Sequence, residues 1–445
     1  MTLDERLSNC AVIGAAGKMG RGIVLVLLKE MVSTDLRLGR PLSTLICIDR
    51  SSEGLSTLKT YLKTQILKFA ERNISMLRSW YNDNASLVDN GEMIEHFLNQ
   101  CSNMIITDSS YSFLNKTQMV FEAVFENLEI KSSIFSEIKN ICPKSCLFFS
   151  NTSSIPISEL NYRNDLFGRL IGFHFYNPPA VQKLVEVITI KQNKQINITL
   201  AHELISRMGK LAVPSNDIAG FIGNGHFIRE GLSYLREINA LPYSNTASLV
   251  FINDIVQDLM FRPMGIFQLI DYVGIDVFSM ICDTMGSYIK EDFQNDIISS
   301  MKDAGILGGQ YGNGSQKDGF FKYENGSISE VYDWEKEVYI SVEKVRKELT
   351  DIKFPELSQT WKSLSRSKDL SYVKECFEAY IESEQLPQKY AFKFLLISQK
   401  IARDLHIGGV AQKIDYVNEV MTNGFFHLYG PASDLIPSIP ETDNE

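Results

Sequence analysis

Two apolar runs separated by prolines are the clearest feature of the hydrophobic pattern. Residues 169–175 and 183–190 are dominated by aliphatic and aromatic side chains, and Asn177, Pro178 and Pro179 lie between them. Because proline cannot donate to a sheet ladder and Asn-Pro favours a turn, this pattern predicts a β-hairpin.

The predicted hairpin brings two ionisable residues together. If its centre lies near Ala180, His174 and Glu186 are symmetrical about the turn and face each other across the two strands. A carboxylate fixes the tautomer of a neighbouring imidazole and stabilises its protonated form, as a general base requires. The alternative is a buried histidine that is satisfied by a neighbouring acid and has no chemical role.

The N-terminal segment 10–28 has the pattern of a buried strand, a glycine turn and a helix. Gly14, Gly17 and Gly20 form GxxGxxG, one residue longer than the GxGxxG dinucleotide fingerprint. Glycines let the backbone approach a pyrophosphate, and the helix that follows supplies N–H groups. A tight strand-to-helix turn without a ligand is the alternative.

A second predicted strand, 44–48, ends in Asp49. An acid at this point hydrogen-bonds the ribose 2′-hydroxyl and repels a 2′-phosphate, which favours NAD over NADP. Asp49 lies 29 residues beyond Gly20, further than the usual spacing of about 20. The adjacent Arg50 could accommodate a phosphate, so NADP stays open as the alternative.

Beyond Asp49 the pattern alternates between helical and extended segments. Residues 53–101 have helical periodicity, 104–107 form a short apolar strand, and 119–138 combine a strand with an amphipathic helix. A further strand, 147–150, runs into Asn-Thr-Ser-Ser, whose hydroxyls would lie at the carboxyl end of a parallel strand, where doubly wound sheets bind ligands. Helix capping by Ser153 is the rival interpretation. The alternation predicts an α/β fold with a doubly wound sheet.

Composition narrows the class of protein. A chain of 445 residues implies two or three domains, and 44 Lys and Arg against 54 Asp and Glu give a net charge of −10 without a basic stretch typical of nucleic-acid binding. The seven cysteines form neither a CxxC pair nor a Cys/His zinc pattern, which favours a reducing compartment and no metal site. The first residues lack signal-peptide character, and the longest apolar run, 23–28, is too short to cross a bilayer. We therefore expect a cytoplasmic protein without nucleic-acid or membrane partners.

The string SNTSS…FGRLIGFHFYNPPAVQKLVEVI closely resembles the signature of the L-3-hydroxyacyl-CoA dehydrogenase family. This resemblance implies a Rossmann-type NAD-binding domain followed by an all-α C-terminal part of the 6-phosphogluconate dehydrogenase C-terminal-like type. It also implies reversible oxidation of an L-3-hydroxyacyl-CoA to the 3-ketoacyl-CoA, in fatty acid β-oxidation or short-chain acyl-CoA metabolism.

The resemblance assigns roles to residues at matching positions. It implies that His174 takes the proton of the 3-hydroxyl, that Glu186 orients His174, and that Ser153 and Asn224 hold the substrate oxygen. Asn224 lies in AGFIGNG, which is similar to the family's PGFIxNR but lacks its proline and arginine. An asparagine at a helix start otherwise indicates a cap.

Further matches concern the coenzyme and CoA. FEAVFENLEIK resembles VEAIxENLxxK, which places Glu126 and Lys131 near the nicotinamide ribose, although a structural pair on one helix is the alternative. Lys68 and Arg72 are expected to contact CoA phosphates, unless they are solvated charges on a helix face. The complete set of predicted coenzyme contacts is Gly14, Gly17, Lys18, Met19, Gly20, Asp49, Glu126, Lys131, Ser153 and Asn177.

The predicted domains are 1–216, which binds NAD, 217–325, which is helical, and 326–445, a degenerate helical repeat preceded by an exposed segment and helix over 324–350. Segment 416–430 aligns with 251–265. Single-copy relatives dimerise through the helical domain, so the second copy is expected to replace the dimer partner, and the chain is a monomer or a homodimer.

Two other functions stay open from the sequence. The first is a CoA-independent dehydrogenase of hydroxy acids, such as the gulonate-type relatives. The second is a non-enzymatic NAD-binding relative, for which we would expect loss of the polar residues Ser153, His174, Glu186 and Asn224, all of which are present.

Overall fold

The computed structural model describes residues 1–82, 84–312 and 314–437, and it divides into two compact units, 1–217 and 218–445. The last eight residues of the predicted repeat 326–445 lie outside the described residues. The three-domain division remains a prediction.

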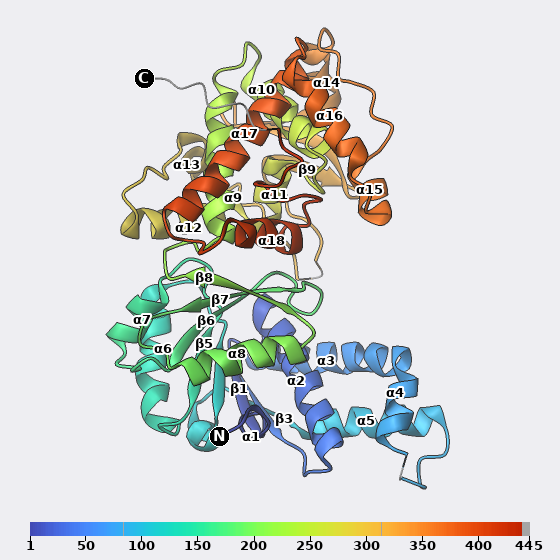
Figure 1. The fold of residues 1–445 in the computed structure, drawn as a ribbon, viewed down its shortest axis with the longest axis vertical. Helices are drawn as coiled ribbons and strands as arrows, with labels where there is room; N and C mark the ends of the chain where they lie inside the picture. Colours follow the sequence, from blue (N-terminus) through green and yellow to red (C-terminus); the bar gives the residue numbers. More distant parts are fainter. Residues whose placement is uncertain (83, 313, 438–445) are drawn as a thin grey trace. The chain divides into compact units, whose positions relative to one another are not determined.

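The first unit is built on an eight-stranded sheet with the order β3-β2-β1-β4-β5-β6-β7-β8 (Figure 1). Strands β1 to β6 are parallel, β7 is antiparallel to β6, and β8 is parallel to β7. From β1 the chain adds β2 and β3 on one side of the sheet, and then β4 and the later strands on the other side. The boundary between β1 and β4 is therefore the switch point at which doubly wound folds bind ligands. The predicted fold class is confirmed. The strands are β1 Asn9–Ile13, β2 Thr44–Ile48, β3 Ile105–Asp108, β4 Met119–Glu122, β5 Leu147–Ser150, β6 Leu170–Phe175, β7 Leu184–Thr189 and β8 Leu211–Asn216.

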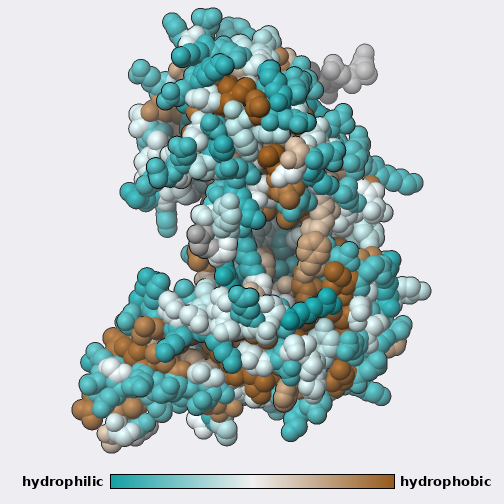
Figure 2. All heavy atoms as spheres, turned by 180° about the vertical axis from the view of Figure 1, so that it is seen from behind, coloured by the Kyte–Doolittle hydropathy of each residue, from teal (hydrophilic) through white to brown (hydrophobic). Residues whose placement is uncertain are grey.

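Helices cover both faces of this sheet. Side chains of α2, α3 and α8 pack with one face, around the rings of Phe121, Phe149 and Phe173, whereas α6 and α7 cover the other. Hydrophobic residues, brown in Figure 2, gather over the arm formed by α3, α4 and α5. The helices are α1 Leu3–Arg6, α2 Lys18–Leu38, α3 Ser52–Arg72, α4 Ile74–Trp80, α5 Asn90–Asn103, η1 Ser112–Lys116, α6 Leu128–Ile141, α7 Ile157–Arg163 and α8 Gln195–Arg207.

The predicted hairpin is confirmed. Strands β6 and β7 pair antiparallel, and His174 is directly opposite Glu186 in the register. Successive side chains of a strand point to opposite faces of the sheet. Once the centre of the hairpin was placed from the sequence, the pairing of His174 with Glu186 therefore followed.

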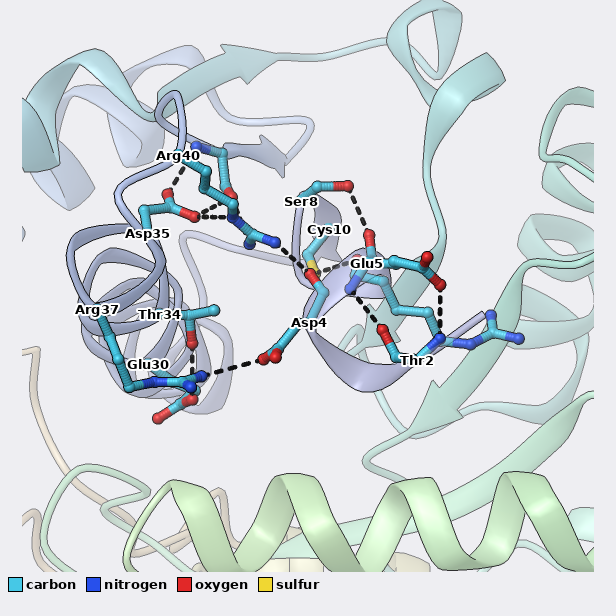
Figure 3. A network of polar contacts seen from close by, with 12 residues as sticks. Thr2, Asp4, Glu5, Ser8, Cys10, Glu30, Thr34, Asp35, Arg37 and Arg40 are labelled. Atoms are coloured by element: carbon cyan, nitrogen blue, oxygen red, sulfur yellow. Dashed lines mark hydrogen bonds and ion pairs between the residues drawn. The ribbon is translucent and has the colours of Figure 1, made fainter.

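A buried polar network ties the end of α2 to the start of β2 (Figure 3). The Asp35 carboxylate, 1% exposed, accepts hydrogen bonds from Arg40 Nε at 2.6 Å and from the backbone N–H and hydroxyl of Ser43, both at 2.7 Å. These contacts join the end of α2 to Arg40 and Ser43, so Asp35 holds the loop that precedes β2.

Replacing Asp35 with alanine is expected to lower the free energy of unfolding by roughly 3 kcal/mol, because a charged guanidinium and a buried N–H lose their acceptor. Urea unfolding, followed by fluorescence, measures this change. Glu71→Ala, which removes an exposed carboxylate from α3, is the control. Equal midpoints for the two variants would contradict the structural role of Asp35.

The second unit is mainly helical. Helices α9 and α17 pack against each other: the ring centroids of Tyr234 and Phe394 lie 4.2 Å apart, and His226 Nε2 lies 3.2 Å from the Ser398 carbonyl oxygen. The elements are α9 Gly223–Ile238, α10 Asn245–Asp254, the π-helical η2 Ile255–Leu259, α11 Ile266–Val273, α12 Ile275–Tyr288, α13 Asp296–Asp303, α14 Val342–Arg346, η3 Lys347–Leu349, α15 Trp361–Ser367, α16 Ser371–Ile381, α17 Leu386–Ile407 and α18 Ile414–Gly424.

The prediction of an exposed segment and helix over 324–350 is wrong for most of that range. A three-stranded antiparallel sheet with the order β11-β10-β9 is formed by β9 Phe321–Glu324, β10 Ser327–Asp333 and β11 Val338–Ser341. Asn325 and Gly326 both have positive φ, 51° and 81°, as a tight Asn-Gly hairpin requires. This Asn-Gly signal was present in the sequence, but the many charges around it favoured the wrong interpretation.

Matching segments of the predicted helical repeat share unusual local geometry. In segments 251–265 and 416–430, the matching residues Phe261 and Phe426 both adopt positive φ, 48° and 58°. A Cβ atom at Gly265 would lie 2.1 Å from Asn253 Oδ1, and one at the matching Gly430 would lie 2.2 Å from Asn418 Oδ1. Identical requirements at matching positions support the register of the repeat.

Candidate functional site

The glycine turn after β1 leaves no room for side chains. Gly14 has a φ of +79°, and a Cβ atom at Gly20 would lie 1.9 Å from the Gly14 carbonyl oxygen. Gly17 caps α2 without a side chain, so the first N–H groups of a 21-residue helix face the turn. This geometry fits the pyrophosphate of a dinucleotide, which needs close backbone approach and a helix N-terminus.

A cavity of about 580 Å³ lies beside this turn and is lined by residues from β1, β2, the loop after β3 and the loop after β4. The Asp49 carboxylate accepts the N–H of Ala16 at 3.0 Å, so it is held against the glycine turn. Arg50 also lines the cavity, and the sequence did not predict the contribution of Ser109, Ser110 and Tyr111. The cavity joins the pyrophosphate turn to the acid expected at the ribose, which fits the adenosine half of NAD.

Lys18 is exposed at the first position of α2, and Met19 packs against the core of the first unit. Their contacts with the coenzyme remain predictions. Lys68 and Arg72 are both exposed and lie one turn apart on α3, so their contact with CoA also remains a prediction.

Glu126 organises the loop that follows β5. One of its carboxylate oxygens accepts the Thr152 hydroxyl at 2.5 Å and the backbone N–H groups of Ser153 and Ser154 at 2.9 and 3.1 Å. Glu126 and Lys131 do form an ion pair, at 3.2 Å, but they do not lie on one helix as that alternative assumed, because Glu126 precedes α6, whose N-cap is Asn127. Because Glu126 lies in the loop after β4, its carboxylate can reach the loop after β5, residues 151–156, which we call the serine loop.

Lys131 is buried and paired with two acids. Its Nζ lies 2.7 Å from Glu122 and 3.2 Å from Glu126, and its side chain is 1% exposed. Burial disfavours the ammonium, but the two carboxylates outweigh burial and raise the pKa of Lys131, while Lys131 helps to lower the pKa of Glu126. Lys131 therefore stays charged, and almost none of its surface is accessible. Its predicted contact with the coenzyme, like that of Glu126, remains a prediction.

The histidine–glutamate pair is the chemical centre of the first unit. His174 Nδ1 lies 2.8 Å from Glu186 Oε2, and the Tyr176 hydroxyl donates to the same oxygen at 2.8 Å. Glu186 is fully buried, and burial together with this carboxylate raises the pKa of Tyr176, which stays a neutral donor. The sequence analysis missed Tyr176, although its position two residues after His174 indicated the same side of the strand.

A hydrogen bond attaches the serine loop to the strand that carries His174. The Phe175 N–H donates to Asn151 Oδ1 at 2.9 Å, which links the end of β6 to the end of β5. Ser153 follows in this loop and Asn177 follows β6, and both are partly exposed. The structure thus gathers these predicted residues at the carboxyl ends of neighbouring parallel strands, while their roles remain predictions.

Asn224 belongs to the second unit. It is the second residue of α9, whose N-cap position is Ile222 and has no side-chain cap, so Asn224 is not the cap that its position suggested as an alternative. Its contact with substrate remains a prediction. Among the residues that the structure describes, no group of three or more His, Cys, Asp or Glu side chains could hold a metal ion.

The first unit has a doubly wound sheet, a glycine turn suited to a dinucleotide, and a histidine held by a buried carboxylate. Together these features are typical of a nucleotide-dependent dehydrogenase. Comparison with known proteins specifies the family. The NAD binding domain of 3-hydroxyacyl-CoA dehydrogenase matches residues 9–218, and the C-terminal domain of the same family matches residues 220–318. The chain therefore belongs to the 3-hydroxyacyl-CoA dehydrogenase family; it is an oxidoreductase whose coenzyme is NAD.

Individual relatives agree with this assignment. A probable 3-hydroxybutyryl-CoA dehydrogenase of Bacillus subtilis is 30% identical over 238 residues, which cover 53% of this chain and 80% of the relative. The mitochondrial hydroxyacyl-coenzyme A dehydrogenase of Sus scrofa is 29% identical over 282 residues, covering 63% of this chain and 84% of the relative.

The second unit also has a counterpart beyond residue 318. The crystal structure of 3-hydroxybutyryl-CoA dehydrogenase from Escherichia coli K12 covers 95% of this chain and 90% of its own, with a TM-score of 0.65 and 20% identity. At this identity the likeness concerns the fold alone.

Proposed function

We propose that this chain interconverts an L-3-hydroxyacyl-CoA and the corresponding 3-ketoacyl-CoA, with His174 as the general acid and base. The observation that carries the proposal is the contact between His174 Nδ1 and the buried Glu186 carboxylate at 2.8 Å. A carboxylate can only accept, so Nδ1 carries the proton and the lone pair lies on Nε2, the nitrogen that would take the hydroxyl proton.

In the oxidation direction, Nε2 of His174 removes the proton of the 3-hydroxyl, and Glu186 stabilises the resulting imidazolium. Bound NAD supplies the acceptor for the hydride that leaves C3. The Tyr176 hydroxyl fixes the Glu186 carboxylate by donating to it. Ser153 and Asn224 are proposed to donate to the substrate oxygen, and each such donor is worth about 2–4 kcal/mol of barrier.

The proposal is tested by NADH absorbance with acetoacetyl-CoA as the oxidant, with free acetoacetate and NADPH in parallel. Rapid loss of NADH with the CoA ester alone is the expected result, and a slow reaction with NADPH would support the role of Asp49 in coenzyme choice. Turnover of free acetoacetate at a similar rate would replace the proposal with a CoA-independent hydroxy-acid dehydrogenase.

We also propose that the chain is a monomer, because α17 of the second copy already covers α9 of the first within one unit. Light scattering of the purified chain should give about 50 kDa, close to the chain mass of 50.4 kDa. A dimer that persists at nanomolar concentration would contradict this proposal.

A cytoplasmic location is part of the proposal and is supported by the seven cysteines, all of which are free thiols. None of the helices within the described ranges is long and apolar enough to cross a membrane.

A further inference from the structure

A second cavity of the first unit, of about 830 Å³, lies at the opposite edge of the sheet from the coenzyme turn. Its lining includes Leu147, the first residue of β5, whereas the coenzyme turn follows the last residue of β1, and these two strands run parallel. In Figure 1 this is the edge of the sheet near α1 and the N-terminus. The cavity is therefore separate from the NAD site.

The charged lining of this cavity is strongly positive. Its cations are Arg6, Lys139, Lys144, Arg169 and Lys194, against a single acid, Asp165. Asp165 is 70% exposed and pairs with Lys139 at 3.4 Å, so it neutralises only one of the five. The charged lining therefore carries an excess of positive charge.

Within the described part of the chain, the two arginines of the lining donate to backbone carbonyl oxygens and pair with no carboxylate. Arg6, 7% exposed, donates to the Ser145 carbonyl oxygen at 2.8 Å, and its Nε is buried with no hydrogen-bond partner among the described residues. Arg169 is half-buried against the Phe148 ring and donates only to carbonyl oxygens, those of Leu166 and Pro143. Arg6 and Arg169 therefore add positive charge to the cavity wall that no carboxylate among the described residues neutralises, and such a wall favours an anion.

A helix N-terminus adds to the positive potential. The 13-residue helix α8 begins at this cavity, its N-cap Lys194 makes no side-chain cap hydrogen bond, and Asn197 of its first turn lines the cavity. The N–H groups of such a terminus bind phosphate well, particularly beside arginine.

An exposed aromatic side chain stands at the rim. Phe167 lines the cavity and is 80% exposed, and Ile196 beside it in the lining is 62% exposed. A planar ring in that position offers a stacking surface for a nucleobase, and the cavity volume is in the range of small-molecule sites.

We propose that this cavity binds a nucleoside polyphosphate, with the phosphates against Arg6, Arg169 and the start of α8, and the base against Phe167. The ligand is distinct from NAD, because its site lies at the other edge of the sheet. The site is independent of the catalytic roles proposed for His174 and Glu186.

The test is calorimetric titration of ATP into the full chain in the presence of saturating NADH, which fills the coenzyme site. ATP is expected to bind, and the double variant Lys144→Glu/Lys194→Glu is expected to weaken binding by about tenfold or more, since it reverses two of the five positive charges that line the cavity. Both lysines are exposed, so folding is unaffected. The matched control is Lys347→Glu/Lys353→Glu, which changes the net charge equally at exposed positions of the second unit.

A second comparison tests the base contact. Phe167→Ser should weaken ATP binding and leave inorganic tripolyphosphate binding unchanged, because only the ring contact is removed. The proposal is overturned by absence of ATP binding at millimolar concentration, by binding that disappears when NADH is added, or by equal binding to the Lys144/Lys194 double variant. Equal affinity of the wild type for ATP and tripolyphosphate would overturn the nucleoside part.

Discussion

Replacing His174 with glutamine should lower kcat by about 10³–10⁴ while leaving the Kd of NADH nearly unchanged. Glutamine is close to histidine in size and can still bond Glu186, but its amide cannot take the hydroxyl proton at neutral pH. The variant therefore removes the general base without removing the side chain that fills the space beside Tyr176. Steady-state NADH oxidation with acetoacetyl-CoA gives kcat, and quenching of protein fluorescence gives the Kd.

The matched control is His202→Gln, the same chemical change on α8, where His202 is partly buried and no role is proposed for it. This control should keep wild-type activity. Retention of more than a tenth of kcat by the His174 variant would remove His174 from the proposed role.

The second large effect is expected at Glu186. Glu186→Gln should lower kcat by about 10²–10⁴, because the imidazolium formed during oxidation loses its counter-charge and the ring loses the carboxylate that fixes its tautomer. Steady-state NADH oxidation with acetoacetyl-CoA measures kcat, and urea unfolding measures the stability of the variant. A purely structural role for Glu186 would lower the free energy of unfolding without this loss of kcat in the folded variant.

Tyr176→Phe separates orientation from charge. It removes the hydrogen bond that Tyr176 donates to Glu186 Oε2 but keeps the carboxylate, so we expect kcat to fall by about tenfold or less. A loss as large as that of Glu186→Gln would contradict the division of roles and make the hydroxyl itself essential.

Local patterns in the sequence determined the parts of the site that lie close together in the chain or follow a fixed period. The His174–Glu186 pair followed from the centre of one hairpin, because strand alternation leaves no freedom once the turn is placed. The glycine turn and Asp49 followed in the same way from a strand, a turn and a helix. The register of the repeat was visible because two segments carry the same pattern.

Tertiary structure decided the contacts between distant segments. The sequence could not show that Glu126 lies just before α6 and accepts the N–H groups of Ser153 and Ser154. A carboxylate near the start of a helix is compatible with several partners. The sheet over 321–341 was missed because surrounding charges obscured an Asn-Gly turn. The basic cavity was invisible in a chain with a net charge of −10, since its cations come from four separate segments. Periodicity specifies which face a residue takes within one element, whereas only the packing of elements specifies which faces meet.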